Sequence, residues 1–370
     1  MKAIISGGGT GGHIFPAIAI ANCLKRRYED CRILFVGAEG KMEMQKVPQA
    51  GYDIVGLKIA GFQRKKLWKN FSLPFKMISA SLKARKIIKD FSPDIVIGVG
   101  GYASWATLRE AQKLGIPTLL QEQNSFAGKS NMQLSSRAQK ICVAYDDMQR
   151  FFSIENIVKT GNPVRKNISA IRETMQKKRQ DALKTYNFNG EKTTVLVMGG
   201  SLGAGTINQA VENHLDYFFT NDIQLIWQTG KFYYNDIYER NKERLKEYTN
   251  VRITEFITDM EEVYSLADII VSRAGALAIS ELCCVGKPVV LIPSPNVAED
   301  HQRKNAMALV EKEAAKMILD SEADKKITEM LDEIINNGQL RERLGKNILS
   351  LAIVDSDERI VDEAEKIIGK

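Results

Sequence analysis

Short apolar runs alternate with longer amphipathic segments along the whole chain. The apolar runs are rich in Val, Ile and Leu, as buried strands are, and the segments between them are long enough for helices. The predicted strands are Lys2–Ser6, Arg32–Val36, Asp94–Val99, Thr118–Gln121 and Lys140–Ala144, then Thr193–Met198, Gln224–Gln228, Arg252–Phe256, Asp268–Ser272 and Pro288–Ile292. Strands that alternate with helices predict parallel sheets with helices on both faces, an α/β fold.

The two halves of the chain follow the same plan. Each opens with a strand that runs into a glycine-rich turn, at Gly7–Gly9 and at Gly199–Ser201, and then into a helix. We therefore expect two doubly wound, Rossmann-like domains that face a cleft, with ligands at the carboxyl ends of the strands. The expected domains are 1–163 and 164–345, with 346–370 as a C-terminal helix that packs back on the first domain.

Charge is shared unevenly between these halves. Residues 1–163 carry 24 Lys and Arg against 12 Asp and Glu, whereas the remainder carries 28 against 33. The first half is therefore suited to an anionic partner, which could be nucleic acid, a phospholipid surface or a phosphorylated substrate.

Other features of the sequence indicate a cytosolic protein. The first residues have no signal-peptide pattern, and no apolar run reaches the roughly 18 residues of a membrane-spanning helix. The cysteines are five in number, lack metal-type spacing and lie among apolar neighbours. We expect them to be reduced thiols of the core.

The first glycine-rich loop, Gly7–Gly12, ends at one of only three histidines, His13. Glycines allow a backbone to approach a phosphate closely, and an imidazole can take a proton from an attacking hydroxyl. Two alternatives stay open. His13 can be structural, and the loop with Glu39 after the next strand also fits a dinucleotide-binding pattern.

The second half carries a matching set of residues. A strand ends at Ser272, a small-residue turn follows, and a helix begins whose N-terminus favours a diphosphate. Glu281, one to two turns into that helix, is placed to accept hydrogen bonds from ribose hydroxyls. Polar residues at 294–306 are suited to sugar hydroxyls. In the first half, Tyr102, Glu122 and Gln123 follow predicted strands and form, with His13, an expected acceptor-side rim.

One acidic pair resembles a metal-binding motif. Asp355-Ser356-Asp357 has the D-x-D spacing, but it precedes the last predicted helix instead of following a core strand. A helix N-cap is the better interpretation. We expect no metal requirement and no cofactor.

Several ordered motifs together are specific. They are Gly-Gly-Gly-Thr-Gly-Gly-His (7–13), Gly-Gly-Tyr (100–102), Glu-Gln-Asn (122–124), Gly-Asn-Pro-Val-Arg (161–165), Gly-Gly-Ser (199–201), Glu-Phe-Ile (255–257), Ser-Arg-x-Gly-Ala-Leu (272–277) and Asp-His-Gln…Asn-Ala (300–306). In this order and over nearly the whole chain, the sequence resembles the MurG family of peptidoglycan glycosyltransferases. The resemblance implies a GT-B fold and inverting transfer of N-acetylglucosamine from UDP-N-acetylglucosamine to undecaprenyl-diphosphate-linked MurNAc-pentapeptide. Another GT-B UDP-sugar transferase, or a nicotinamide-dependent oxidoreductase, is the alternative.

The resemblance also implies roles for single residues. On the side of the donor sugar and the acceptor, it implies that Thr10, Gly11 and Gly12 line the site and that Asn124 contacts the sugar. For the nucleotide, it implies binding by Arg165 and Ser201 and hydrogen bonds from the Ile257 backbone to the edge of the uracil. The diphosphate and the ribose would be bound by Ala276, Leu277, Ala278, Ser280 and Glu281, and the sugar hydroxyls by Gln302. The family often has a hydroxyl residue where this chain has Ala278. Backbone N–H groups or Ser280 must then serve the diphosphate.

A basic stretch in the first half suggests a membrane surface. No acidic residue occurs from Ile54 to Lys89, and aromatic and aliphatic residues alternate there with Lys and Arg, including Arg64, Lys65, Lys66 and Lys69. Such a stretch favours an anionic lipid surface. We expect residues 58–89 to dock the enzyme at the cytoplasmic face of the inner membrane, unless they form only a solvated basic helix. No aromatic-rich RNA motif supports nucleic acid as the partner.

Overall fold

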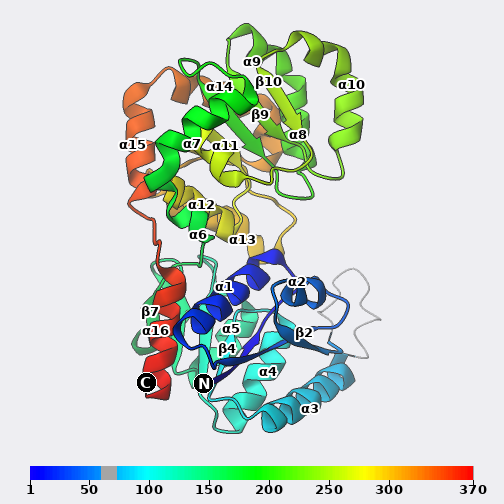
Figure 1. The fold of residues 1–370 in the computed structure, drawn as a ribbon, viewed down its shortest axis with the longest axis vertical. Coiled ribbons are helices and arrows are strands. Elements are labelled where there is room, and N and C mark those ends of the chain that lie inside the picture. The colour runs from blue at the N-terminus through cyan, green and yellow to red at the C-terminus, as the bar shows by residue number, and fades with distance from the viewer. Residues whose placement is uncertain (60–72, 370) are drawn as a thin grey trace. The chain divides into compact units, whose positions relative to one another are not determined.

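The computed structural model describes residues 1–59 and 73–369. The chain divides into two compact units, and the first of them is made from both ends of the chain. Unit 1 comprises Met1–Val164 and Asp355–Lys370, and unit 2 comprises Arg165–Val354. Both are drawn in Figure 1 with the helix and strand labels used below.

Unit 1 is built on a parallel sheet that has, in the described residues, seven strands. Its strands are β1 (Lys2–Ser6), β2 (Arg32–Ala38), β3 (Asp53–Leu57), β4 (Ile95–Gly98), β5 (Thr118–Glu122), β6 (Lys140–Val143) and β7 (Ile157–Lys159). Its α-helices are α1 (Gly11–Arg27), α2 (Glu43–Gln49), α3 (Leu73–Phe91), α4 (Tyr102–Lys113), α5 (Lys129–Leu134) and α16 (Ser356–Ile368). The strand order β3-β2-β1-β4-β5-β6-β7 reverses direction between β1 and β4, which is the switch point of a doubly wound sheet.

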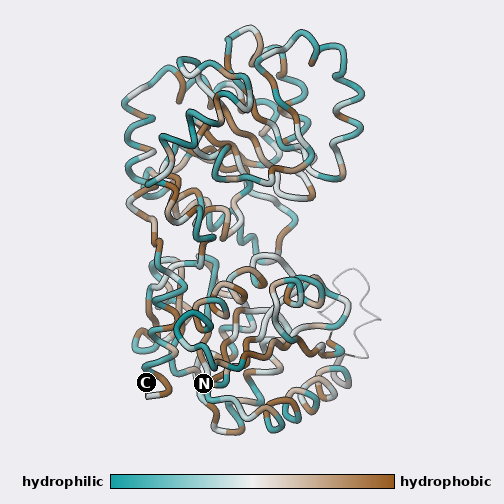
Figure 2. The backbone as a smooth tube through the Cα atoms, viewed as in Figure 1, coloured by the Kyte–Doolittle hydropathy of each residue, from teal (hydrophilic) through white to brown (hydrophobic). Residues whose placement is uncertain are grey.

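Alternate side chains of the central strand β1 enter two different cores. Ile5 belongs to the cluster that includes α1 and α16, whereas Ile4 belongs to the cluster that includes α3 and α4. Both side chains are fully buried because helices cover both faces of the sheet. The strands accordingly appear as hydrophobic segments at the centre of each unit in Figure 2.

Unit 2 repeats the same architecture with six parallel strands in the order β10-β9-β8-β11-β12-β13. The strands are β8 (Thr194–Met198), β9 (Gln224–Gln228), β10 (Val251–Thr254), β11 (Ile269–Ser272), β12 (Val289–Leu291) and β13 (Lys316–Met317). The α-helices are α6 (Lys166–Ser169), α7 (Ile171–Tyr186), α8 (Gly205–Asn213), α9 (Leu215–Thr220), α10 (Tyr234–Glu247), α11 (Met260–Leu266), α12 (Ala276–Val285), α13 (His301–Val310), α14 (Ala323–Ile335) and α15 (Gly338–Leu349). The switch point here lies between β8 and β11.

All ten strands predicted from the sequence are present, and the prediction of two doubly wound domains is confirmed. β1 and β9 have the predicted bounds. Three strands were not predicted, and each lies at the edge of its sheet: β3, β7 and β13. Among the described residues, none of the helices combines the length and the hydrophobicity that a bilayer-spanning segment requires.

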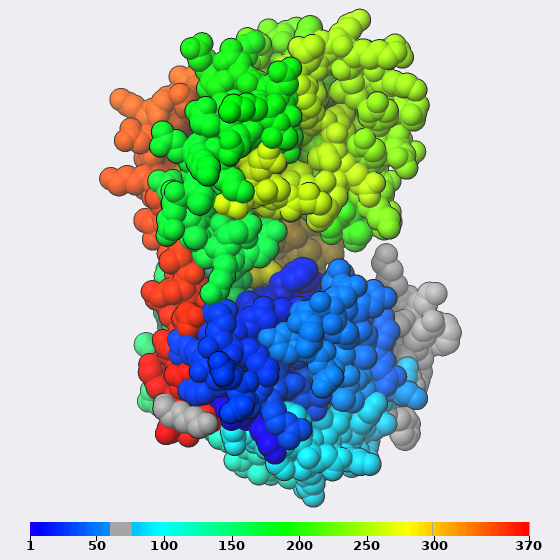
Figure 3. Space-filling model, viewed as in Figure 1, coloured from blue at the N-terminus to red at the C-terminus, as the bar shows by residue number. Residues whose placement is uncertain are grey.

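The last helix, α16, packs on α1 within unit 1, and Figure 3 shows the C-terminal residues lying against the N-terminal ones. Ile360, Val361 and Ala364 of α16 are buried in the same cluster as β1 and α1. The boundary lies after Val354, because α15 packs on α12 and α14 of unit 2. Residues 346–354, expected with the last helix, therefore belong to unit 2.

Ion pairs surround this apolar contact. Arg27 on α1 binds Glu358, Asp362 and Glu365 at N–O distances of 2.6, 2.6 and 3.0 Å. Arg26 donates to Glu358 at 2.7 Å, and these arginines lower the pKa of Glu358 to about 2, from an ordinary value of 4.5. The pairs that Glu358 forms with Arg26 and Arg27 therefore add to the contact only while Glu358 is ionised.

Changing Glu358 to Gln is expected to reduce the free energy of unfolding at pH 7 by about 1 kcal/mol, the upper end for partly exposed pairs. Because the folded-state pKa is lowered, this stability is complete above the ordinary value of 4.5 and disappears as the pH falls through about 2. Urea unfolding of both proteins from pH 7 to pH 2 measures the difference. The control is Glu155→Gln at an exposed position of unit 1. A difference that does not shrink below pH 4.5 would contradict the ion-pair explanation.

Candidate functional site

Unit 2 contains a pocket of about 840 Å³ at the carboxyl ends of β8 and β11, its switch point. Several residues predicted from the sequence share this pocket: Arg165, Ser201, Ile257, Ala278, Glu281 and Gln302. A pocket of this volume is in the range of small-molecule and cofactor sites. The position is the one at which doubly wound sheets bind nucleotides.

A tight glycine turn after β8 forms one wall of the pocket. Gly203 has a φ of +88°, and a Cβ on Gly230 would lie 2.1 Å from the Gly203 nitrogen. Side chains at these two positions would force the loops after β8 and β9 apart. The aromatic ring of Tyr233 packs over Gly203 and also lines the pocket.

The N-terminus of α12 forms a second wall. Its N-cap, Gly275, has extended backbone and supplies no side-chain cap, so the N–H groups of the first turn receive no hydrogen bond from it. Ala278 lines the pocket, whereas Ser280 donates to the carbonyl of Ala276 at 3.0 Å, within the helix. Backbone N–H groups are therefore the better placed of the two donors expected to replace a hydroxyl at position 278.

Glu281 is held by two partners in the pocket. Arg165 donates to both carboxylate oxygens, at 2.8 and 2.9 Å, and the hydroxyl of Tyr264 donates to Oε2 at 3.3 Å. The Tyr264 side chain is only 1% exposed, and burial raises its pKa well above the ordinary value. A carboxylate accepts about four hydrogen bonds, so Glu281 keeps limited capacity for a ligand while Arg165 remains bound.

Gln302 is oriented by the backbone. The amide N–H of Ser294 donates to its carbonyl Oε1 at 2.9 Å, which leaves the Gln302 NH₂ group as the free end of the side chain. Gln302 can therefore donate to a ligand oxygen in the pocket. Arg273, part of the 272–277 motif, and Asp320 had no role expected from the sequence, yet both line the pocket and form an ion pair. Asp320 also accepts from Thr206 at 2.9 Å, so the pair links α8 to the β11 turn.

His13 of unit 1 lies in the first turn of α1, directly after the glycine-rich loop. Its Nδ1 lies 2.9 Å from the carbonyl oxygen of Gly8, and its Nε2 lies beside Gly100, where an added Cβ would be 2.9 Å away. Thr10 is the N-cap residue of α1, but its side chain makes no capping hydrogen bond. The first N–H groups of the helix, which begins at Gly11 and Gly12, therefore receive no hydrogen bond from the Thr10 hydroxyl. The switch point of this sheet therefore carries an imidazole beside uncapped N–H groups.

The residues expected on the acceptor side have different surroundings. Glu122 is 2% exposed and accepts hydrogen bonds from Asn124, Gly128 and Asn131, and Gln123 is equally buried and donates to the carbonyl of Val99. These two side chains position the loop after β5 from inside. Tyr102, by contrast, is 51% exposed at the start of α4.

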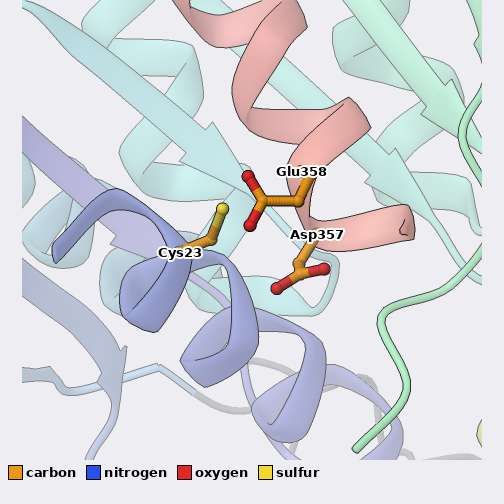
Figure 4. A group of neighbouring side chains, drawn as sticks. All are labelled: Cys23, Asp357 and Glu358. Atoms are coloured by element: carbon orange, nitrogen blue, oxygen red, sulfur yellow. The ribbon is translucent and has the colours of Figure 1, made fainter. Parts of the chain in front are cut away.

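The D-x-D pattern takes part in a different cluster. Asp357 and Glu358 of α16 lie near Cys23 of α1, and the Glu358 carboxylate points toward the thiol (Figure 4). The possible ligand atoms of the three residues lie within 4.8 Å of one another. Both carboxylates are bound by Arg26, and burial raises the pKa of the Cys23 thiol to about 12. A neutral thiol and two arginine-bound carboxylates are a poor ligand set for a metal ion. Asp355 does occupy the N-cap position of α16, as expected, but its carboxylate accepts from Arg359 at 2.8 Å and makes no capping hydrogen bond.

Comparisons with known proteins agree with this arrangement. Residues 3–143 match the glycosyltransferase family 28 N-terminal domain, and residues 194–360 match the glycosyltransferase family 28 C-terminal domain. The chain is 52% identical, over 100% of its length and 99% of the relative, to the UDP-N-acetylglucosamine–N-acetylmuramyl-(pentapeptide) pyrophosphoryl-undecaprenol N-acetylglucosamine transferase of Parabacteroides distasonis.

Two solved structures are also similar. MurG of Acinetobacter baumannii has a TM-score of 0.79 at 27% identity, with 99% of each chain covered. The calicheamicin glycosyltransferase CalG4 has a TM-score of 0.71 at 15% identity, over 100% of this chain and 98% of its own, and shares the fold. The matches to both family 28 domains and the full-length identity to a peptidoglycan transferase place this chain in the MurG family of glycosyltransferases.

Proposed function

We propose that this chain transfers N-acetylglucosamine from UDP-N-acetylglucosamine to the muramyl 4-hydroxyl of undecaprenyl-diphosphate-linked MurNAc-pentapeptide, the step that converts lipid I to lipid II in peptidoglycan synthesis. The observation that carries the proposal is identity of about half the residues, over the full chain, with relatives that are named for this reaction. Family membership also favours a glycosyltransferase over a nicotinamide-dependent oxidoreductase.

The pocket of unit 2 supports binding of the donor. Its volume suits a nucleotide sugar, and the uncapped N-terminus of α12 can hold the diphosphate. Glu281 would receive the ribose hydroxyls, which requires that they share or replace the two hydrogen bonds from Arg165. Gln302 would donate to a sugar hydroxyl.

The loop after β1 supports the transfer step. In the proposed reaction the acceptor oxygen attacks the anomeric carbon, its proton passes to His13, and the bond to UDP breaks with inversion. The electron pair goes to the leaving diphosphate, where helix N–H groups stabilise the growing charge. The acceptor-side roles of Tyr102 and Asn124 belong to the same proposal.

A UDP-release assay with a lipid-linked muramyl-pentapeptide acceptor tests the function. We expect UDP release that requires both the acceptor and UDP-N-acetylglucosamine, with transfer of the sugar to the lipid. Titration with NAD(P) is the matched control. Binding of NAD(P) without binding of UDP, or UDP release that does not depend on the acceptor, would contradict the proposal.

We also propose that unit 1 docks on the anionic cytoplasmic face of the inner membrane. In α3, Ile78 and Leu82 are 59% and 64% exposed, and Lys86 and Lys89 are exposed on the same side of the helix. Exposed apolar side chains beside lysines suit a headgroup region. The expected basic residues from Arg64 to Lys69 lie outside the described residues, so the argument rests on α3.

Changing Lys86 and Lys89 together to Gln is expected to weaken binding to anionic vesicles by about 2 kcal/mol, roughly 30-fold, at low salt. Binding of the unchanged protein should also weaken as salt rises, because the attraction is screened. Vesicle co-sedimentation measures both effects. Changing Lys177 and Lys184 of α7 to Gln removes the same charge from unit 2 and should leave binding unchanged. Equal losses in the two double variants would place the docking surface elsewhere.

A further inference from the structure

Glu43 at the start of α2 is a buried carboxylate that the sequence does not mark as functional. We propose that Glu43 is a positioning residue for His13 and acts on it through a single peptide group of the glycine-rich loop. The inference rests on the proposed role of His13 as the base in sugar transfer.

The Glu43 carboxylate joins the loops that follow β1 and β2. Its Oε2 accepts from the backbone N–H of Gly9 at 2.9 Å, and its Oε1 accepts from the N–H of Ala38 at 2.9 Å. The residue is 1% exposed. Hydrogen bonds between backbone N–H groups and an ionised, buried acceptor are short and strong. Glu43 therefore fixes the glycine-rich loop against the end of β2.

Two glycines make room for this carboxylate. A Cβ on Gly8 would lie 2.2 Å from Cδ of Glu43, and a Cβ on Gly37 would lie 2.6 Å from its Cγ. Side chains at these positions would push Glu43 out of its place. The Glu43 carboxylate therefore explains why Gly8 and Gly37 are glycines. This reason is separate from the close approach of a phosphate to the loop.

The peptide group that joins Gly8 to Gly9 connects Glu43 to the imidazole. Its N–H donates to Glu43, and its carbonyl oxygen, Gly8 O, lies 2.9 Å from Nδ1 of His13. Hydrogen bonds at both ends of one peptide polarise each other. A carboxylate on the N–H end makes the carbonyl a stronger acceptor, which favours the tautomer with the proton on Nδ1.

This tautomer is the one that a base needs here. With the proton on Nδ1, Nε2 has a free lone pair, and it lies beside Gly100, which has no side chain to cover it. When Nε2 takes the acceptor's proton, the imidazolium keeps its Nδ1–H bond to Gly8 O. Glu43 then stabilises the new positive charge through the same peptide, as a carboxylate does for a catalytic histidine.

The test is Glu43→Gln in the full chain, since glutamine has the same shape but can accept at only one end. We expect kcat to fall roughly 10- to 100-fold, the cost of a misplaced catalytic group. The KM for UDP-N-acetylglucosamine should stay within about twofold, because the pocket of unit 2 is untouched. Glu39→Gln is the matched control: Glu39 follows the same strand but binds Lys83 instead of the loop.

Nitrogen-15 NMR of labelled histidine measures the tautomer of His13. This tautomer would not change if Glu43 only stabilised the fold. The chain has three histidines, so the His13 signals can be assigned with a His13→Asn variant. In the unchanged protein we expect the Nδ1–H tautomer of neutral His13, because Gly8 O can only accept from Nδ1. In Glu43→Gln we expect a mixture of both tautomers, because the loop is no longer held through Gly9 N–H and Gly8 O moves away from the ring.

Several results would overturn the proposal. A dominant Nε2–H tautomer in the unchanged protein would do so whether or not the variant folds. An unchanged tautomer or an unchanged kcat in Glu43→Gln would do so as well. Failure of the proposed function is a separate result, because it appears as missing sugar transfer by the unchanged protein.

Discussion

Turnover is expected to fall by about 10²- to 10⁴-fold when His13 is replaced with alanine, the usual contribution of a general base. The imidazole is the titratable side chain of the α1 first turn, and the uncapped N–H groups beside it cannot accept a proton. Affinity for UDP-N-acetylglucosamine should change little, because the donor pocket lies in unit 2. Steady-state kinetics with the lipid acceptor measures turnover, and calorimetric titration with UDP-N-acetylglucosamine measures the affinity for the donor.

His214→Ala is the control for this prediction. His214 is partly exposed in unit 2, where its Nε2 lies 2.7 Å from the carbonyl oxygen of Asp324, and its loss should leave turnover within about twofold. A loss of less than threefold in His13→Ala would remove this histidine from the role of base. The preorganised N–H donors would then carry the larger share of catalysis.

The second large effect is expected at Glu281. Replacing it with alanine should weaken UDP binding by about 1.5–3 kcal/mol, as for hydrogen bonds to a charged group. The structure adds a cost in stability. The buried hydroxyl of Tyr264 loses the acceptor that lies 3.3 Å away, which should reduce the free energy of unfolding by about 1–3 kcal/mol. Calorimetric titration and urea unfolding measure these two effects separately.

The variant Tyr264→Phe separates the effect on donor binding from the effect on the free energy of unfolding. It removes the buried hydroxyl but keeps the Glu281 carboxylate and its two hydrogen bonds from Arg165. Donor affinity should therefore stay within about twofold in Tyr264→Phe while the Glu281 variant loses it. Equal affinities in the two variants would mean that Glu281 serves only to hold Arg165 and Tyr264.

The sequence predicts the central strands well because their information is local. β4 and β8 are continuous apolar runs, buried on both faces, and such runs are visible without any tertiary knowledge. The edge strands carry less information. β13 has two residues and β7 has three, so their pairing depends on the neighbouring strand and not on a pattern of their own.

The candidate site is predictable where it consists of glycine turns and helix starts, as at Gly199–Ser201 and Gly275. It is not predictable where burial decides. Nothing in the sequence separates buried Glu43 from exposed Glu39, since both follow β2 within a few residues. Glu122 and Gln123 were placed on the rim for their polarity, yet the loop after β5 encloses both. The role of Tyr264 depends on its hydrogen bond to Glu281, which lies on a different helix and cannot be paired with it from the sequence.

The return of α16 to unit 1 also has a consequence for the order in which the protein is completed at the ribosome. Translation supplies N-terminal domains first, and a continuous domain can close as soon as its own residues have emerged. Unit 1 cannot, because Ile360, Val361 and Ala364 belong to its core and are translated only after unit 2. Unit 2, Arg165–Val354, is encoded without interruption and can close earlier. The nascent N-terminal half therefore keeps an apolar surface beside α1 uncovered until α16 has been synthesised.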